Sequence, residues 1–119
     1  GLNTSRTWYD REDVDVVLDV PNSAIAFAVA NLAREKNKVA IFTGAASSDL
    51  TGRACGPNHL HWVYDTWSQA YATATALVQE GGDTWYFITA DYAFGHAVER
   101  DTGNFVRAAG GRVLGSGRY

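Results

Sequence analysis

Three short stretches carry the side chains that are best suited to binding a small molecule, and each follows a predicted strand. The stretch "DVPNSA" places Ser23 at the start of a predicted helix. The stretch "TGAASS" is a row of small residues whose backbone amides can be approached closely, and "TADYAFG" brings Tyr92 and Phe94 to a third strand end. In open α/β sheets, ligands bind beyond the carboxyl ends of the strands. Helix N-termini offer unpaired N–H groups that suit a carboxylate or another anion, and aromatic rings offer apolar faces.

Each of these features also has an ordinary structural explanation. Asn22 or Ser23 could be a simple helix cap, "GAASS" a flexible turn, and Tyr92 with Phe94 a hydrophobic staple or core residues. The occurrence of all three at equivalent strand ends is what favours a binding site over three unrelated local features.

Motifs of the common enzyme classes are missing. The chain has no GxGxxG, no GxxxxGK[ST] and no GxSxG, so dinucleotide, P-loop and hydrolase sites lack support. His59 and His61 form an HxH, but no third metal ligand occurs at a suitable spacing, and we expect a solvated or interdomain pair. Asp65, Asp83 and Asp91 are interpreted as helix caps and turn formers. The sequence therefore predicts no catalytic residues, no metal site and no cofactor.

Composition excludes several kinds of partner. With 119 residues, of which 46% are hydrophobic, and a net charge of -3, the chain is an ordinary folded domain without a basic patch. Binding to nucleic acid is therefore not expected. Direct membrane insertion is not expected either, because no apolar run approaches about 18 residues. The chain contains no methionine and opens on glycine, which we interpret as a processed protein or a piece of a longer one. Cys55 is the only cysteine, so it is either a free thiol or has its disulfide partner outside this sequence.

The predicted elements alternate between strands and helices. Apolar runs bounded by turn residues predict strands, and three-four spacing between capping residues predicts helices. The loop after the second strand, about fifteen residues long, shows no pattern of its own, which is typical of a functional or disordered segment. The first helix is predicted to bury a stripe of Ala24, Phe27, Ala28, Asn31 and Leu32. Strands are predicted at 14–20, 38–43, 84–90 and 112–119, and helices at 23–34, 66–79 and 93–108, with a short strand in 60–67 that runs into the second of these helices.

This order predicts an α/β fold, with a parallel sheet that has helices on both faces. The opening residues "TSRTWYDRED" look like the end of a helix without its preceding strand, and the chain stops within a strand. The sequence therefore resembles a slice through a larger protein.

The segments "VDVVLDVPNSAIAFAVANLAREKNKVAIFTGAASSDLTG", "HWVYDTWSQA" and "WYFITADYAFGHAVERD" occur in the order found in a known family. The chain resembles the type-1 periplasmic solute-binding proteins of ABC transporters, in the branched-chain amino acid (leucine/isoleucine/valine-binding) group. The resemblance covers essentially the whole chain, which would form a central fragment of a protein about three times longer. It implies a two-lobed fold, with residues 1–64 as the second half of lobe 1 and 65–119 as the beginning of lobe 2.

The resemblance also implies a set of ligand-binding residues. The family's carboxylate-binding serine matches Ser23, and its aromatic contact from the second lobe falls on Tyr92 or Phe94. Phe94 stands where the family usually has tyrosine, and Ala46 where amino-acid binders commonly carry a hydroxyl. Both departures fit a more apolar or aromatic carboxylate, or a short amide. The complete set implied is Ser23, Gly44, Ala45, Ala46, Ser47, Asp65, Trp67, Tyr92 and Phe94.

The function implied by the resemblance is solute capture for transport. Such a protein has no enzymatic activity, lies in the periplasm after a signal peptide has been removed, and delivers a small carboxylated solute to a membrane permease. Two alternatives stay open: a ligand-sensing domain of the same fold in a receptor or regulator, and a flavodoxin-like or Rossmann-like enzyme.

Overall fold

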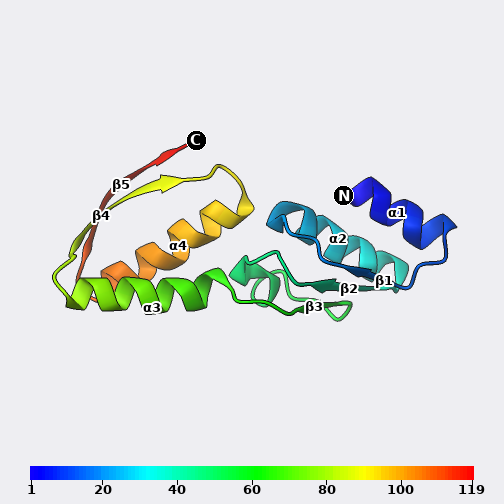
Figure 1. Cartoon of the computed structure of the whole chain (residues 1–119), viewed down its shortest axis with the longest axis horizontal. Coiled ribbons are helices and arrows are strands. Elements are labelled where there is room, and N and C mark those ends of the chain that lie inside the picture. Colours follow the sequence, from blue (N-terminus) through cyan, green and yellow to red (C-terminus); the bar gives the residue numbers. More distant parts are fainter. The chain divides into compact units, whose positions relative to one another are not determined.

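The structure is a computed structural model that describes residues 1–119 (Figure 1). The chain divides into two compact units, Gly1–Val63 and Tyr64–Tyr119. Each unit is described by itself. The assignment of the units to lobes stays a prediction.

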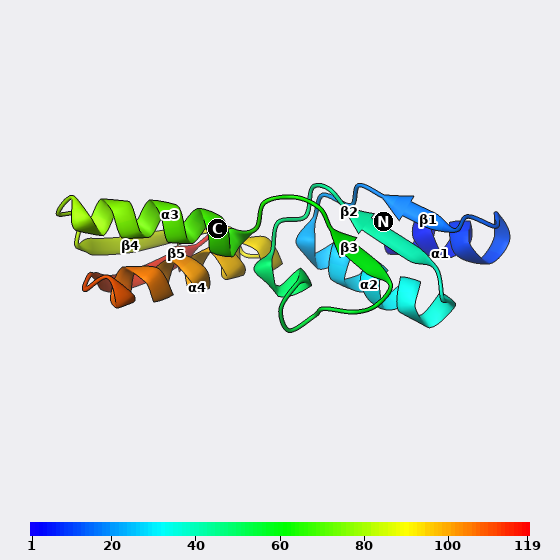
Figure 2. The same ribbon diagram turned by 90° about the horizontal axis from the view of Figure 1, so that it is seen from below.

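The first unit is a three-stranded parallel sheet with its helices packed on one side. Its strand order is β1-β2-β3, with Val17 opposite Ala40 and Ile41 opposite Leu60, and Figure 2 shows β2 between the other two strands. The parallel arrangement confirms the predicted α/β class. The elements are α1 (Leu2–Arg11), β1 (Val16–Leu18), α2 (Ser23–Lys36), β2 (Val39–Phe42), the 3₁₀ helix η1 (Ser48–Leu50) and β3 (His59–His61).

The strand β1 is shorter than the predicted run 14–20. Asp13 and Asp19 adopt left-handed backbone conformations, with φ of 52° and 56°, and these turns bracket the strand. Aspartate tolerates this region better than most residues because its short side chain can hydrogen-bond locally. The run of apolar residues therefore predicted a longer strand than the three residues observed. The amide of Asp19 still donates to the Ile41 carbonyl at 3.1 Å, so the chain leaves β1 close to the end of β2.

The buried face of α2 differs from the predicted stripe. Asn22 caps the helix by accepting a hydrogen bond from the Ile25 amide at 3.1 Å, as one of the two predicted caps. Ala24 and Asn31, however, are exposed, so the prediction that they face the core was wrong. Alanines occur in both possible stripes, and their equal hydropathy left the phase of the helix undecided. The residues that are buried are Ser23, Ala26, Val29, Ala30, Leu32 and Ala33.

The second unit pairs two parallel strands, with α3 and α4 packed against each other (Figure 2). The helices have the predicted bounds. A capping box begins α3: the Asp65 carboxylate accepts the Ser68 amide at 2.7 Å, and the Ser68 hydroxyl accepts the Asp65 amide at 3.4 Å. A register shift between Trp85 and Tyr86 interrupts the strand pair. The elements are α3 (Thr66–Gln79), β4 (Thr84–Thr89), α4 (Ala93–Ala108) and β5 (Arg112–Arg118).

Gly95 allows the first turn of α4 to lie directly against the end of β4. A Cβ atom at this position would overlap the carbonyl oxygen of Ala90, which is a backbone atom and cannot move aside. The same carbonyl accepts the Tyr92 amide at 2.8 Å, which holds the turn tight. The glycine of "TADYAFG" is thus required by close backbone approach.

We expect Gly95→Ala to lower the free energy of unfolding by about 1–3 kcal/mol, because the added methyl group has no space. Gly103→Ala is the matched control in the same helix, since its Cβ would meet only the flexible end of Arg107, at 3.2 Å. That control should be neutral or stabilising by up to about 1 kcal/mol, the usual preference of a helix for alanine. Chemical denaturation followed by tryptophan fluorescence measures both, and equal effects would refute the steric explanation.

Candidate functional site

The first two strand ends are joined by a buried hydrogen bond. Ser23 begins α2 and is 1% exposed, and Ser47 follows β2 and is fully buried. The Ser47 amide donates to Ser23 Oγ, with an N···O distance of 3.3 Å. Because Oγ is the acceptor in this bond, the Ser23 hydroxyl hydrogen is available for another partner. Two of the predicted binding residues are therefore brought together.

The loop after β2 lies close to the loop after β1. A Cβ atom on Gly44 would stand 3.1 Å from Asp19 Oδ1 and 3.1 Å from Pro21 Cα, so the glycine permits this approach. Ala45 and Ala46 are buried. No hydrogen bond within the chain uses the amides of Gly44, Ala45 or Ala46. This row of N–H donors, next to a serine hydroxyl, is an arrangement suited to an anion.

The composition of the loop after β2 had indicated no regular structure, but the structure shows local order there. Ser47 caps the 3₁₀ helix η1 by accepting the Asp49 amide at 3.4 Å, and Leu50 anchors the segment in the core. Local capping by serine had been overlooked as a source of order in this loop.

Two histidines on β3 fasten this loop. His59 Nε2 lies 2.9 Å from the Leu50 carbonyl oxygen, and His61 Nε2 lies 2.7 Å from the Ala45 carbonyl oxygen. A carbonyl oxygen only accepts, so both Nε2 atoms carry a hydrogen and donate. The expectation of a solvated or interdomain pair was wrong, because spacing by two residues puts both rings on one face of the strand, toward the loop. Across the chain, no group of three or more His, Cys, Asp or Glu side chains could hold a metal ion.

In the second unit, Tyr92 and Phe94 flank the start of α4. Tyr92 is the N-cap residue and is 39% exposed, and its ring centre lies 6.0 Å from that of Phe94. Phe94 is half-buried, beside a hollow of about 180 Å³ that Ala90 and Tyr119 also line. The rings thus form an apolar surface at the carboxyl end of β4.

A charged network that sequence reasoning missed holds this turn. The Asp91 Oδ1 atom lies 2.8 Å from His96 Nε2 and 3.3 Å from Arg118 Nη1. The hydrogen bond from His96, and then that from Arg118, hold the pKa of Asp91 below its usual range. A hydrogen bond from Thr89 likewise lowers the pKa of Glu99, with a smaller contribution from Ser116. Pairing of β5 with β4 brings Arg118 here, and no local sequence signal marked that contact.

The structure gives Asp65 and Trp67 other contacts. The Asp65 carboxylate caps α3. The Trp67 ring stacks on Tyr71, with ring centres 5.7 Å apart, and meets Phe105 edge-on at 5.2 Å. Their place in a ligand site stays a prediction.

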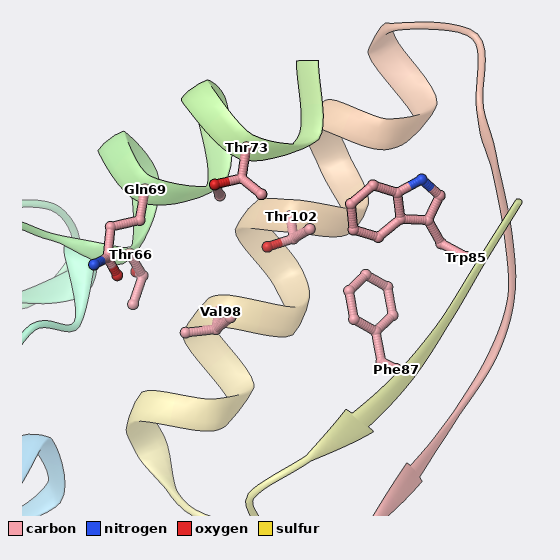
Figure 3. Close-up of a pocket in the computed structure, with 8 residues that line it drawn as sticks. Thr66, Gln69, Thr73, Trp85, Phe87, Val98 and Thr102 are labelled. Atoms are coloured by element: carbon pink, nitrogen blue, oxygen red, sulfur yellow. The ribbon is translucent and has the colours of Figure 1, made fainter. Parts of the chain in front are cut away.

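The groove drawn in Figure 3 adjoins the hollow beside Phe94, since Phe87 and Val98 line both. It has a volume of about 270 Å³ and lies between α3, α4 and β4, with Trp85 and Phe87 pointing from the strand toward Val98 and Thr102. None of its lining residues carries a charge, and none belongs to the predicted set of ligand-binding residues. In each unit, taken by itself, the candidate residues outside this groove are those on the loops at the strand ends.

The family model described as periplasmic binding protein matches residues 1–119. The chain belongs to this family, which is one of solute-binding proteins. No curated protein sequence gave a significant match. Among the helices of the structure there is no candidate for a membrane span.

Solved structures with the same fold include close and distant relatives. A periplasmic binding protein from Burkholderia mallei is 44% identical, with a TM-score of 0.96, and the match covers 99% of this chain and 32% of that one. A branched-chain amino acid ABC transporter periplasmic ligand-binding protein from Burkholderia xenovorans is 32% identical, with a TM-score of 0.77, over the same shares of the two chains. A solute-binding protein of an ABC transporter from R. palustris, in complex with benzoate, is 22% identical with a TM-score of 0.90, covering 99% of this chain and 33% of that one. The chain thus spans about a third of the length of these relatives.

The network at Asp91 predicts a dependence of stability on pH. A carboxyl group whose pKa is lower in the folded than in the unfolded state stabilises the fold above its unfolded pKa, and that stability is lost as the pH falls through the folded value. For Asp91 the loss therefore sets in below about pH 4, near the ordinary aspartate pKa. We expect Asp91→Asn to flatten the fall in the urea midpoint below that pH.

Asp83→Asn is the control, since no ion pair involves Asp83. Midpoints measured for both variants from pH 6 downward decide the question. An Asp91→Asn curve parallel to that of the wild type would contradict the assignment of the acid-sensitive group.

Proposed function

We propose that this protein captures a small carboxylated solute between two lobes and delivers it to the permease of an ABC transporter, as a periplasmic solute-binding protein without enzymatic activity. The observation that carries the proposal is the gathering of the Ser23 hydroxyl and the unpartnered loop amides at neighbouring strand ends. Membership of the periplasmic binding protein family supports it. In this proposal, residues 1–64 belong to lobe 1 and 65–119 to lobe 2.

The carboxylate would be bound by neutral donors. Ser23 lies at the N-terminus of α2, where the unpaired amides of the helix carry partial positive charge. Its hydroxyl and the Ala46 amide are two of the donors that the chain itself leaves unused. Hydrogen bonds to a charged acceptor are about twice as strong as those between neutral groups, so these donors would favour a carboxylate over a neutral group.

The rest of the solute would contact apolar surface. Tyr92 and Phe94 offer ring faces, and Ala46 adds a methyl group rather than a hydroxyl. The carboxylates on the strand-end loops already have partners within their own unit: Asp19 accepts a hydrogen bond from Thr43, and Asp91 pairs with His96, while Asp65 caps α3. None of them is an unpaired carboxylate that is set apart for the ammonium group of an amino acid. These contacts favour an aromatic or otherwise apolar acid over a plain amino acid.

In this proposal the site binds its solute without changing it chemically. It offers a hydroxyl, backbone amides and aromatic rings, and no cofactor is required to bind a solute with them. Closure of two lobes around the solute would couple recognition to docking on the permease. Contacts made by other parts of a two-lobed protein would complete the site.

Calorimetric titration of the protein expressed over its complete reading frame tests the proposal. The panel comprises benzoate, 4-hydroxybenzoate, L-leucine and their neutral amides or alcohols. It is chosen because one solved relative holds benzoate and another, from Desulfitobacterium hafniense, holds Leu. We expect saturable binding of at least one carboxylate, tighter binding of benzoate than of L-leucine, and recovery of the solute unchanged. Absence of binding across the panel, or conversion of a bound compound, would refute the proposal.

Ser23→Ala should weaken binding of the carboxylate by about ten- to a hundredfold, since it removes a donor to a charged group. The control is Ser5→Ala, another buried serine, whose hydroxyl donates to the Gly1 carbonyl within its own helix at 3.1 Å. That control should leave the affinity unchanged. Unfolding midpoints without solute separate a loss of binding from a loss of stability.

A further inference from the structure

The His61–Ala45 hydrogen bond holds the peptide group that carries the Ala46 amide. His61 is half-buried on β3, and its Nε2 donates to the Ala45 carbonyl oxygen at 2.7 Å. Ala45 is fully buried, so its carbonyl would otherwise lie away from solvent without a donor. Loss of this bond would therefore leave the peptide between Ala45 and Ala46 free to rotate toward another partner.

The orientation of that peptide also sets the direction of an unused donor. The bond between Ala45 and Ala46 is trans, as are all peptide bonds of the chain. In a planar trans peptide, the C=O and N–H vectors point in opposite directions. Holding the Ala45 carbonyl toward His61 therefore turns the Ala46 N–H away from β3. No group of the chain accepts a hydrogen bond from that N–H.

The next peptide is held from the other side. The Ser47 amide donates to Ser23 Oγ at 3.3 Å, so the peptide between Ala46 and Ser47 is also fixed. The Ala46 N–H and the Ser23 hydroxyl consequently belong to one connected group, in which His61 holds one end and α2 the other. A donor pair with this support loses little conformational freedom when it binds a carboxylate.

We propose that His61 is a positioning residue for solute binding, which aims the Ala46 amide at the solute carboxylate through its hydrogen bond to the Ala45 carbonyl. The inference rests on the proposed function, because it assumes a carboxylated solute at this loop. It adds a residue that neither contacts the solute nor belongs to the binding set implied by the family resemblance. The HxH motif thereby has a role that requires no metal.

His59 is a built-in comparison. It lies two residues away on the same face of β3, and it donates from the same atom to a carbonyl of the same loop, that of Leu50, at 2.9 Å. That carbonyl belongs to η1 and not to the peptide that carries the Ala46 amide. His59 should therefore matter for the stability of the loop, whereas His61 should matter for affinity as well.

The experiment compares His61→Leu, His61→Gln and His59→Leu in the protein expressed over its complete reading frame. Glutamine places its side-chain amide nitrogen near the position of Nε2 and keeps the donor, whereas leucine fills the space without one. Dissociation constants are measured by calorimetry for benzoate and L-leucine and for the matching alcohols, benzyl alcohol and leucinol. Unfolding midpoints without solute are measured for every variant.

We expect His61→Leu to weaken carboxylate binding by about tenfold, and His61→Gln and His59→Leu to stay within about threefold of the wild type. The loss in His61→Leu should be larger for the carboxylate than for the alcohol, which a purely structural role would not produce. Equal losses in His61→Leu and His59→Leu, or equal losses for acid and alcohol, would overturn the proposal for His61. A wild-type protein that binds neither benzoate nor L-leucine would overturn the proposed function and this inference together, whereas normal wild-type binding with an unaffected His61→Leu would overturn only the inference.

Discussion

The arrangement of the first unit depends on the hydrogen bond from the Ser47 amide to Ser23 Oγ. Parallel strands end at the same edge of a sheet, and the chain leaves each strand there with backbone groups that have no ladder partner. The bond, 3.3 Å long and buried, satisfies one of these groups and ties the loop after β2 to the start of α2. The serine hydroxyl accepts in this bond and so keeps its own hydrogen for a partner from outside the chain.

The side chains that hold the loop, and not its length, decide how well its backbone is ordered. The loop between β2 and β3 contains small residues that have little tendency to order by themselves. His59 and His61 hold two of its carbonyls, and Leu50 lies in the core. A loop held in this way has lost its conformational entropy during folding, so binding of a solute costs less conformational entropy.

In the second unit, other contacts hold the turn between β4 and α4. Gly95 lets α4 begin against the backbone of Ala90, and the Asp91 carboxylate joins His96 on α4 to Arg118 on β5. The turn is thus fixed by a close backbone approach and by exposed ion pairs, which salt and acid weaken. Tyr92 and Phe94 belong to this turn, so its contacts also fix the positions of their rings.

Much of the fold followed from local sequence, because caps, turn glycines and apolar runs act over a few residues. The bounds of α3 and α4, the Asn22 cap and the parallel strands were predictable in this way. The buried stripe of α2 was not, since alanines on both sides of the helix have the same hydropathy and only packing on the sheet selects between them. The hydrogen-bond partners of His61, Arg118 and His96 could not be predicted from local sequence either. Their partners lie 5 to 27 residues away in sequence, and strand pairing and loop packing decided which polar groups met.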